Sequence, residues 1–114
     1  MTQLELFFTI LLTTQFFHSI EEASMGFNKK FPLFKMPLWT FLLFEAMFQG
    51  FFWFVLLNEA FGSRETFMHI FALLMFANGL WHIVWWGIIK KYVPGLATAP
   101  IFLIIFITFY FKIT

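Results

Sequence analysis

Long apolar stretches with almost no charge constrain this chain more than any other feature. Of its 114 residues, 61% are hydrophobic and only 11% are charged. A soluble domain of this size needs a charged, polar surface to meet water, and this chain has too few charged residues to supply one. The mean hydropathy of +0.86 leads to the same conclusion. We therefore expect lipid to be the solvent for most of the surface.

Four of these stretches are close to the length of a membrane-spanning helix, about 20 residues. They cover roughly residues 4–25, 37–60, 66–89 and 96–111. Polar residues with turn-forming Gly or Pro separate them, and no repeat or linker interrupts the series. The sequence thus predicts an all-α fold, an integral membrane bundle of four transmembrane helices that forms a single domain over residues 1–114.

The positions of the basic residues predict how such a bundle is oriented. Five of the seven lie after the first or the third predicted helix: Lys29, Lys30, Lys35, Lys90 and Lys91. Because positively charged loops stay on the cytoplasmic side, we expect loops 1 and 3 to be cytoplasmic. Both termini then lie outside, in a multi-pass protein of the cell membrane.

Several function classes are excluded by residues that the chain lacks. It has no cysteine, which removes disulfides, thiolate metal ligands and a cysteine nucleophile. It has no aspartate, so a Ser/His/Asp triad cannot be built, and no H-E-x-x-H, P-loop or G-x-G-x-x-G motif occurs. A net charge of +1 without a basic stripe argues against a nucleic-acid partner.

Ionisable residues inside the predicted helices point to function, because each costs about 2.5 to 3.5 kcal/mol near the centre of a membrane. His18, Glu21 and Glu22 stand at positions i, i+3 and i+4, so they share one face of the first helix. Asn78 and His82 share a face of the third helix by the same rule.

Three predicted helices place an ionisable group at the same depth. His18, Glu45 and His82 each lie eight residues from the lysine-rich end of their helix, which is about 12 Å at 1.5 Å per residue. Two histidines with neighbouring carboxylates are typical ligands of Zn, Fe or Mn. A divalent metal would also relieve the repulsion between adjacent carboxylates. We therefore predict a metal site made by His18, Glu21, Glu22 and His82.

Structural readings of the same residues stay open. The H-S-I-E-E segment could be a solvated helix end, and His82 with Asn78 could be interhelical packing contacts. Glu45, with Gln49 one turn later, could be structural in the same way. His69 lies near the opposite end of its helix and is typical of an interfacial histidine.

The sequence resembles the HXXEE membrane protein family, whose function is unknown. The resemblance is carried by three motifs in order. They are His18-Ser19-Ile20-Glu21-Glu22, a later histidine, and Tyr92-Val93-Pro94-Gly95, which matches the family's Y-x-P-G motif. The later histidine corresponds best to His82, which follows Asn78 and lies beside the Y-x-P-G segment, with His69 as the alternative.

The Y-x-P-G segment also has a physical interpretation. Pro94 cannot continue a helix, and Gly95 permits the positive φ of a chain reversal. Tyr92 can direct its hydroxyl toward polar groups at the interface. We expect a turn with Tyr92 over the cytoplasmic mouth of the site.

These observations favour a metal-dependent membrane hydrolase or oxidoreductase that acts on a lipid or another apolar substrate. Among the carboxylates Glu21, Glu22 and Glu45, either Glu22 or Glu45 would act as general base. The alternatives are a small proton- or cation-coupled transporter, and a binding subunit of a larger membrane complex. A bundle of four helices would need a homo-oligomer to form a pore or a carrier.

Overall fold

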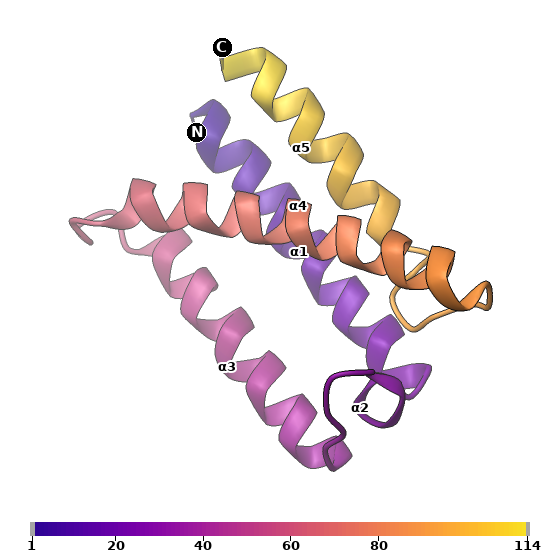
Figure 1. Cartoon of the computed structure of the whole chain (residues 1–114). Coiled ribbons are helices and arrows are strands. Elements are labelled where there is room, and N and C mark those ends of the chain that lie inside the picture. The colour runs from indigo at the N-terminus through magenta and orange to yellow at the C-terminus, as the bar shows by residue number, and fades with distance from the viewer. Residues whose placement is uncertain (1, 114) are drawn as a thin grey trace.

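The computed structural model describes residues 2–113, and all regular secondary structure within them is helical, which confirms the predicted all-α class (Figure 1). Its helices are α1 (Gln3–Ser24), α2 (Phe27–Lys30), α3 (Leu38–Leu57), α4 (Arg64–Ile89) and α5 (Ala99–Ile113).

The boundaries of the long helices lie close to those predicted, and the differences have local causes. The short helix α2 was not predicted, and it follows Gly26, which caps it with a φ of +78°. Helix α3 ends at Leu57 because Asn58 leaves the helical conformation, with φ −101° and ψ 89°. Helix α5 starts at Ala99, three residues later than predicted, because the chain after the Y-x-P-G segment is still forming turns.

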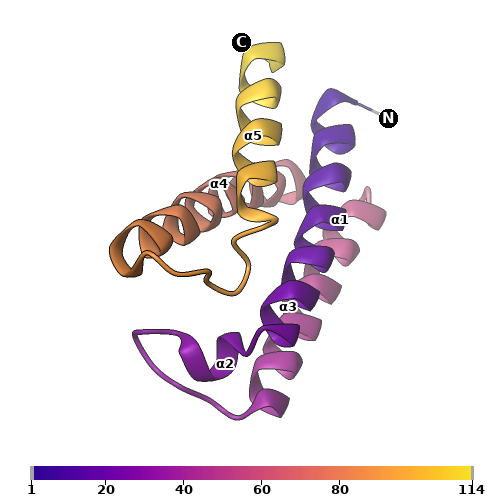
Figure 2. The same cartoon turned by 90° about the vertical axis from the view of Figure 1, so that its right-hand side faces the viewer.

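Helices α1 and α3 run antiparallel to each other, and α5 lies along the other side of α1 (Figures 1 and 2). Helix α4 crosses this set at a steep angle. It meets α3 at their connected end and diverges from α3 beyond it, so the two helices enclose a wedge (Figure 1). The N-terminal part of α1 and the C-terminal part of α5 lie at the same end of the molecule.

An aromatic core fills the end of the bundle where α3 joins α4. Phe52 and Phe71 have ring centroids 4.6 Å apart, and Phe8 reaches Phe71 edge-on at 5.1 Å. Leu11, Leu12, Val55 and Met68 are buried around these rings. Because this half of the bundle is apolar, the buried polar residues of α1 and α4 are confined to the other half.

Helix α5 approaches α4 closely because Gly79 has no side chain. A Cβ atom at Gly79 would lie 2.8 Å from the carbonyl oxygen of Ala99, closer than real atoms pack. This close approach places the loop between α4 and α5 over the C-terminal half of α4.

Two of the four predicted spans, α3 and α4, are long and apolar enough to cross a membrane. Helix α1 has 22 residues but includes Gln15, His18 and three glutamates. Helix α5 has 15 residues, fewer than the roughly 20 needed for a full span. Many large apolar side chains of α3 and α4 face outward, among them Phe44, Met47 and Leu73. Water is a poor solvent for such a surface, and lipid is a good one.

The guanidinium of Arg64, the first residue of α4, links α4 to α3 and α1 by hydrogen bonds. It donates hydrogen bonds to the carbonyl oxygens of Val55 and Leu56 at 3.0 and 2.7 Å, and to the carboxylate of Glu5 at 2.9 Å. Two C-terminal carbonyls of α3 are thus satisfied by the first residue of α4.

We predict that Arg64→Met lowers the free energy of unfolding by about 2 kcal/mol, because two carbonyls lose a charged donor. Chemical unfolding in detergent micelles, followed by circular dichroism, measures the loss. Glu5→Gln keeps an acceptor and leaves both carbonyl bonds intact, so its effect should be smaller. Equal losses for both variants would show that the ion pair, rather than the carbonyl contacts, dominates.

Candidate functional site

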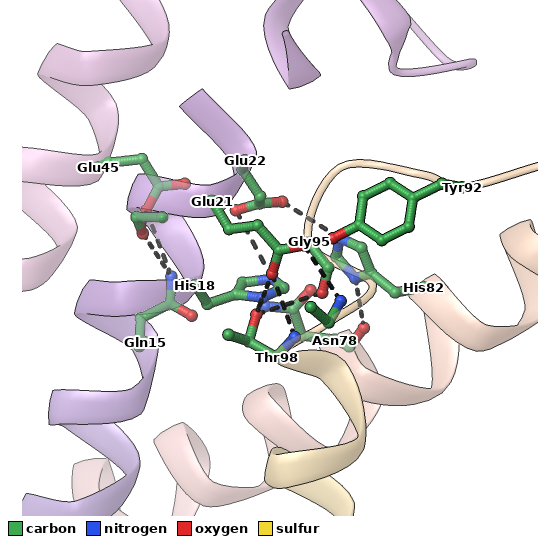
Figure 3. Close-up of polar contacts among 12 residues, drawn as sticks. Gln15, His18, Glu21, Glu22, Glu45, Asn78, His82, Tyr92, Gly95 and Thr98 are labelled. Carbon is green, nitrogen blue, oxygen red and sulfur yellow. Dashed lines mark hydrogen bonds and ion pairs between the residues drawn. The ribbon is translucent and has the colours of Figure 1, made fainter. Parts of the chain in front are cut away.

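His18, Glu22 and His82 meet inside the protein, although α1 and α4 are far apart in the sequence (Figure 3). Their exposed fractions are 0%, 4% and 1%. One ligand atom from each lies within 4.8 Å of the other two. The Glu22 carboxylate approaches Nε2 of His18 at 3.6 Å and Nε2 of His82 at 3.2 Å.

Helical spacing and helix crossing together create this group. His18 and Glu22 are one turn apart on α1, so both point to the same neighbour. Helix α4 crosses that face of α1, and the two imidazole rings meet edge to face with centroids 4.7 Å apart. Phe102 of α5 closes the other side of His18, with ring centroids at 5.0 Å.

The backbone determines which nitrogen of His82 carries hydrogen. Nδ1 of His82 lies 2.8 Å from the carbonyl oxygen of Asn78. A carbonyl oxygen can only accept, so we assign the hydrogen to Nδ1. Neutral His82 therefore directs the lone pair of Nε2 toward Glu22.

Thr98 determines the tautomer of His18 in the same way. The Thr98 hydroxyl donates to Oε1 of Glu21 at 2.8 Å, and its oxygen lies 2.5 Å from Nδ1 of His18. Since the hydroxyl hydrogen is already used, Nδ1 of His18 must donate to Thr98. Neutral His18 then presents a lone pair at Nε2, and this buried atom has no hydrogen-bond partner among the described residues.

The centre of the group thus consists only of acceptors: two imidazole nitrogens and a carboxylate. The hydrogen bond of 3.2 Å between Nε2 of His82 and Oε2 of Glu22 then requires a shared proton, while Nε2 of His18 still has no partner among the described residues, which is costly in a buried place. A metal ion at the centre would satisfy all three side chains. Two imidazoles and one carboxylate are also the protein ligands of many catalytic zinc sites, which leave one position open.

Glu21 points away from this group and anchors the loop between α4 and α5. Its carboxylate accepts hydrogen bonds from the backbone N–H groups of Ala97 and Thr98 at 3.1 Å each, and from the Tyr92 hydroxyl. Partial burial raises the pKa of Tyr92, and the bond to Glu21 raises it further, so Tyr92 remains a donor at neutral pH. The sequence predicts Glu21 as a metal ligand, whereas in the structure Glu21 lies outside the group of His18, Glu22 and His82 and is bonded to the loop instead.

Gly95 of the Y-x-P-G segment lies directly against both imidazoles. Its φ is +92°, and an added Cβ would lie 2.6 Å from Cε1 of His18 and 2.7 Å from Nε2 of His82. Glycine is needed here for its conformation and for its lack of volume. The backbone at Gly95 is thereby part of the wall of the site.

Glu45 lies on the other side of α1 from Tyr92 (Figure 3) and outside the His/Glu group. Its Oε2 accepts hydrogen bonds from the Ser19 hydroxyl at 2.8 Å and from Nε2 of Gln15 at 3.3 Å. His18 and His82 therefore meet as predicted, while Glu45 is hydrogen-bonded to Ser19 and Gln15 rather than to either histidine.

Of the remaining predicted residues, Asn78 lies at the site and His69 does not. Asn78 contributes its backbone oxygen to His82 and lines a neighbouring cavity. His69 is exposed, next to Phe109, so His82 is the histidine of the site. Sequence reasoning missed Thr98 and Gln15, since a single Thr in a loop and a single Gln in a helix carry no recognisable spacing.

Fold and site define a class: an all-helical protein, with two helices apolar and long enough for a membrane, that encloses a buried His/Glu/His group. The chain belongs to the family described as protein of unknown function with HXXEE motif, whose family model matches residues 9–110. No curated protein and no solved structure matches this chain.

We predict that Gly95→Ala disrupts the site. A side chain at positive φ costs about 1–3 kcal/mol, and overpacking against two buried imidazoles costs about 1–3 kcal/mol more. Gly26→Ala is the matched control, because Gly26 has a φ of +78° and a Cβ there would only touch Lys30, at 3.8 Å. Thermal unfolding and the histidine Cε1–H NMR signals should change more for Gly95→Ala. Equal behaviour of the two variants would contradict the packing of Gly95 against the imidazoles.

Proposed function

We propose that this chain is a membrane-embedded, metal-dependent enzyme that acts on a lipid or another apolar substrate. One observation carries the proposal: ligand atoms of three buried side chains converge, and one of them, Nε2 of His18, has no hydrogen-bond partner among the described residues. A divalent cation such as Zn, Fe or Mn fits this donor set better than a hydrogen-bond network does.

In this proposal, His18, Glu22 and His82 hold the metal. When bound, a metal of this kind activates water and polarises a carbonyl or phosphoryl oxygen. The protein supplies a dry, fixed setting for that chemistry. Three protein ligands would leave a coordination position for water or substrate.

The groups behind the imidazoles support the same function. Ligand histidines commonly donate their other N–H to a carbonyl or, directly or indirectly, to a carboxylate, which fixes the ring and raises its basicity. His82 donates to Asn78, and His18 is linked through Thr98 to Glu21. We therefore assign Glu21 and Thr98 as positioning residues, and Tyr92 as the group that holds Glu21 in place.

The membrane setting supports an apolar substrate. Helices α3 and α4 are apolar enough to span, and we propose that α1 and α5 are embedded beside them with the lysine-rich loops on the cytoplasmic side. A substrate dissolved in the bilayer could then reach the buried group without crossing water.

A second candidate function, proton transfer, is favoured by a specific observation. Hydrogen bonds connect His18 through Thr98 and Glu21 to the Tyr92 hydroxyl, and Tyr92 is half exposed. This chain of contacts leads from a buried imidazole to the surface, as in proton relays. This route begins at Nδ1 of His18, whereas the metal would be held at Nε2, so metal content and proton flux together distinguish the two functions.

We predict that the purified protein binds one divalent metal ion per chain. His18→Ala, Glu22→Gln and His82→Ala should each abolish stoichiometric binding, because three ligands cannot lose one and remain tight. His69→Ala is the matched control and should retain the metal. Elemental analysis by mass spectrometry measures the ratio. Metal-free wild-type protein, with proton flux in liposomes that is lost in Thr98→Val, would favour the relay instead.

We predict that Thr98→Val weakens metal binding by about 10- to 100-fold, the usual effect of removing a group that orients a ligand. The variant keeps the shape of the side chain but removes the acceptor for His18. Thr108→Val, which loses only an exposed bond to the Ile104 carbonyl, is the control. Competition with a fluorescent chelator measures both affinities. Unchanged binding in Thr98→Val would refute the positioning role.

A further inference from the structure

A cavity of about 500 Å³ lies in the wedge between α3 and α4. This volume is within the range of small-molecule sites, about 300–1,000 Å³. Glu22 and His82 line it, so the cavity reaches the His/Glu group directly. The segment that includes α2 closes part of it through Phe27, Phe31 and Phe34.

Aromatic rings form most of the wall. Phe41 and Phe44 of α3 and Trp81 of α4 face the three phenylalanines from the α2 segment. Such a wall suits an alkyl chain, and its ring faces also attract a cation. No Lys or Arg is among the residues that line this cavity, so nothing in the wall would pair with an anion.

The polar atoms on the side of Glu45 are hydrogen-bond acceptors. Gln15 and Glu45 both line the cavity. Gln15 is only 3% exposed, and its Oε1 has no hydrogen-bond partner among the described residues. Ser19 and Gln15 both donate to Oε2 of Glu45, which leaves Oε1 of Glu45 available. A half-buried carboxylate beside a buried, unpaired amide oxygen favours a ligand that donates hydrogen bonds and carries positive charge.

We propose that this cavity binds an amphiphile with a primary ammonium head and a single alkyl chain, with the head between Glu45 and Gln15 and the chain along the aromatic wall. An ammonium group has three donors and no acceptor, which matches the two available oxygens. The inference rests on the proposed function because it takes this ligand to be the substrate of the proposed enzyme. The atoms next to the head group would then face Glu22 and His82, which line the same cavity. Glu45 is then a substrate-binding residue rather than the general base.

Photo-crosslinking tests this assignment. Dodecylamine with a diazirine in its chain is added to the full-length protein in phosphatidylcholine nanodiscs, and mass spectrometry locates the adducts. We expect adducts on Phe31, Phe44 and Trp81, removed by excess dodecylamine but not by dodecanol or dodecanoate. Glu45→Gln and Gln15→Leu should each weaken the competition by dodecylamine about tenfold or more, since each removes an acceptor of a charged donor.

Two controls separate this inference from the metal proposal. Glu59→Gln removes an exposed carboxylate outside the cavity and should leave labelling unchanged. Treatment with EDTA removes any metal and should also leave it unchanged, because the head binds at Glu45. Competition by dodecanoate that equals that of dodecylamine after EDTA treatment, or adducts outside the cavity, would overturn the assignment even if the protein binds metal.

Discussion

The rest of the structure is arranged around a buried group of three side chains, His18, Glu22 and His82. Their facing atoms are brought together by the crossing of α1 and α4. Each imidazole is oriented by a hydrogen bond on its opposite nitrogen, one to a backbone carbonyl and the other to a hydroxyl. Polar atoms of this kind are costly in a low-dielectric interior unless they are paired. The surrounding helices and the loop after α4 therefore have to hold all three side chains in fixed orientations.

The two adjacent glutamates of the H-x-x-E-E motif have different tasks because successive helical residues project about 100° apart. Glu22, one full turn after His18, faces inward to both histidines. Glu21 is directed to the loop after α4, where two N–H groups, Thr98 and Tyr92 bind it. That loop carries Gly95 against the imidazoles. One carboxylate of the motif, Glu22, thus contacts both histidines, and the other, Glu21, binds the loop that packs against them.

The sequence allowed the helices and the meeting of His18 with His82 to be predicted, because both follow from periodicity and depth along a helix. It did not separate the roles of Glu21 and Glu22, since i+3 and i+4 positions both qualify as neighbours of His18 and only the loop decides between them. Glu45 shares their predicted depth but bonds Ser19 and Gln15 instead of the histidines, because depth along an axis says nothing about rotation around it. Thr98 acts through a loop conformation, which has no periodic signal.

The division of the bundle into an apolar half and a polar half explains why a cavity adjoins the site. Aromatic packing of Phe8, Phe52 and Phe71 ties α1, α3 and α4 together at one end. Since α4 crosses at a steep angle (Figure 1), it must separate from α3 toward the other end, and only the α2 segment and side chains partly fill the wedge. The same crossing that brings His82 to Glu22 therefore opens the space lined by Glu45 and Gln15. The His/Glu group and the cavity are two consequences of one helix angle, so a change in that angle would alter both together.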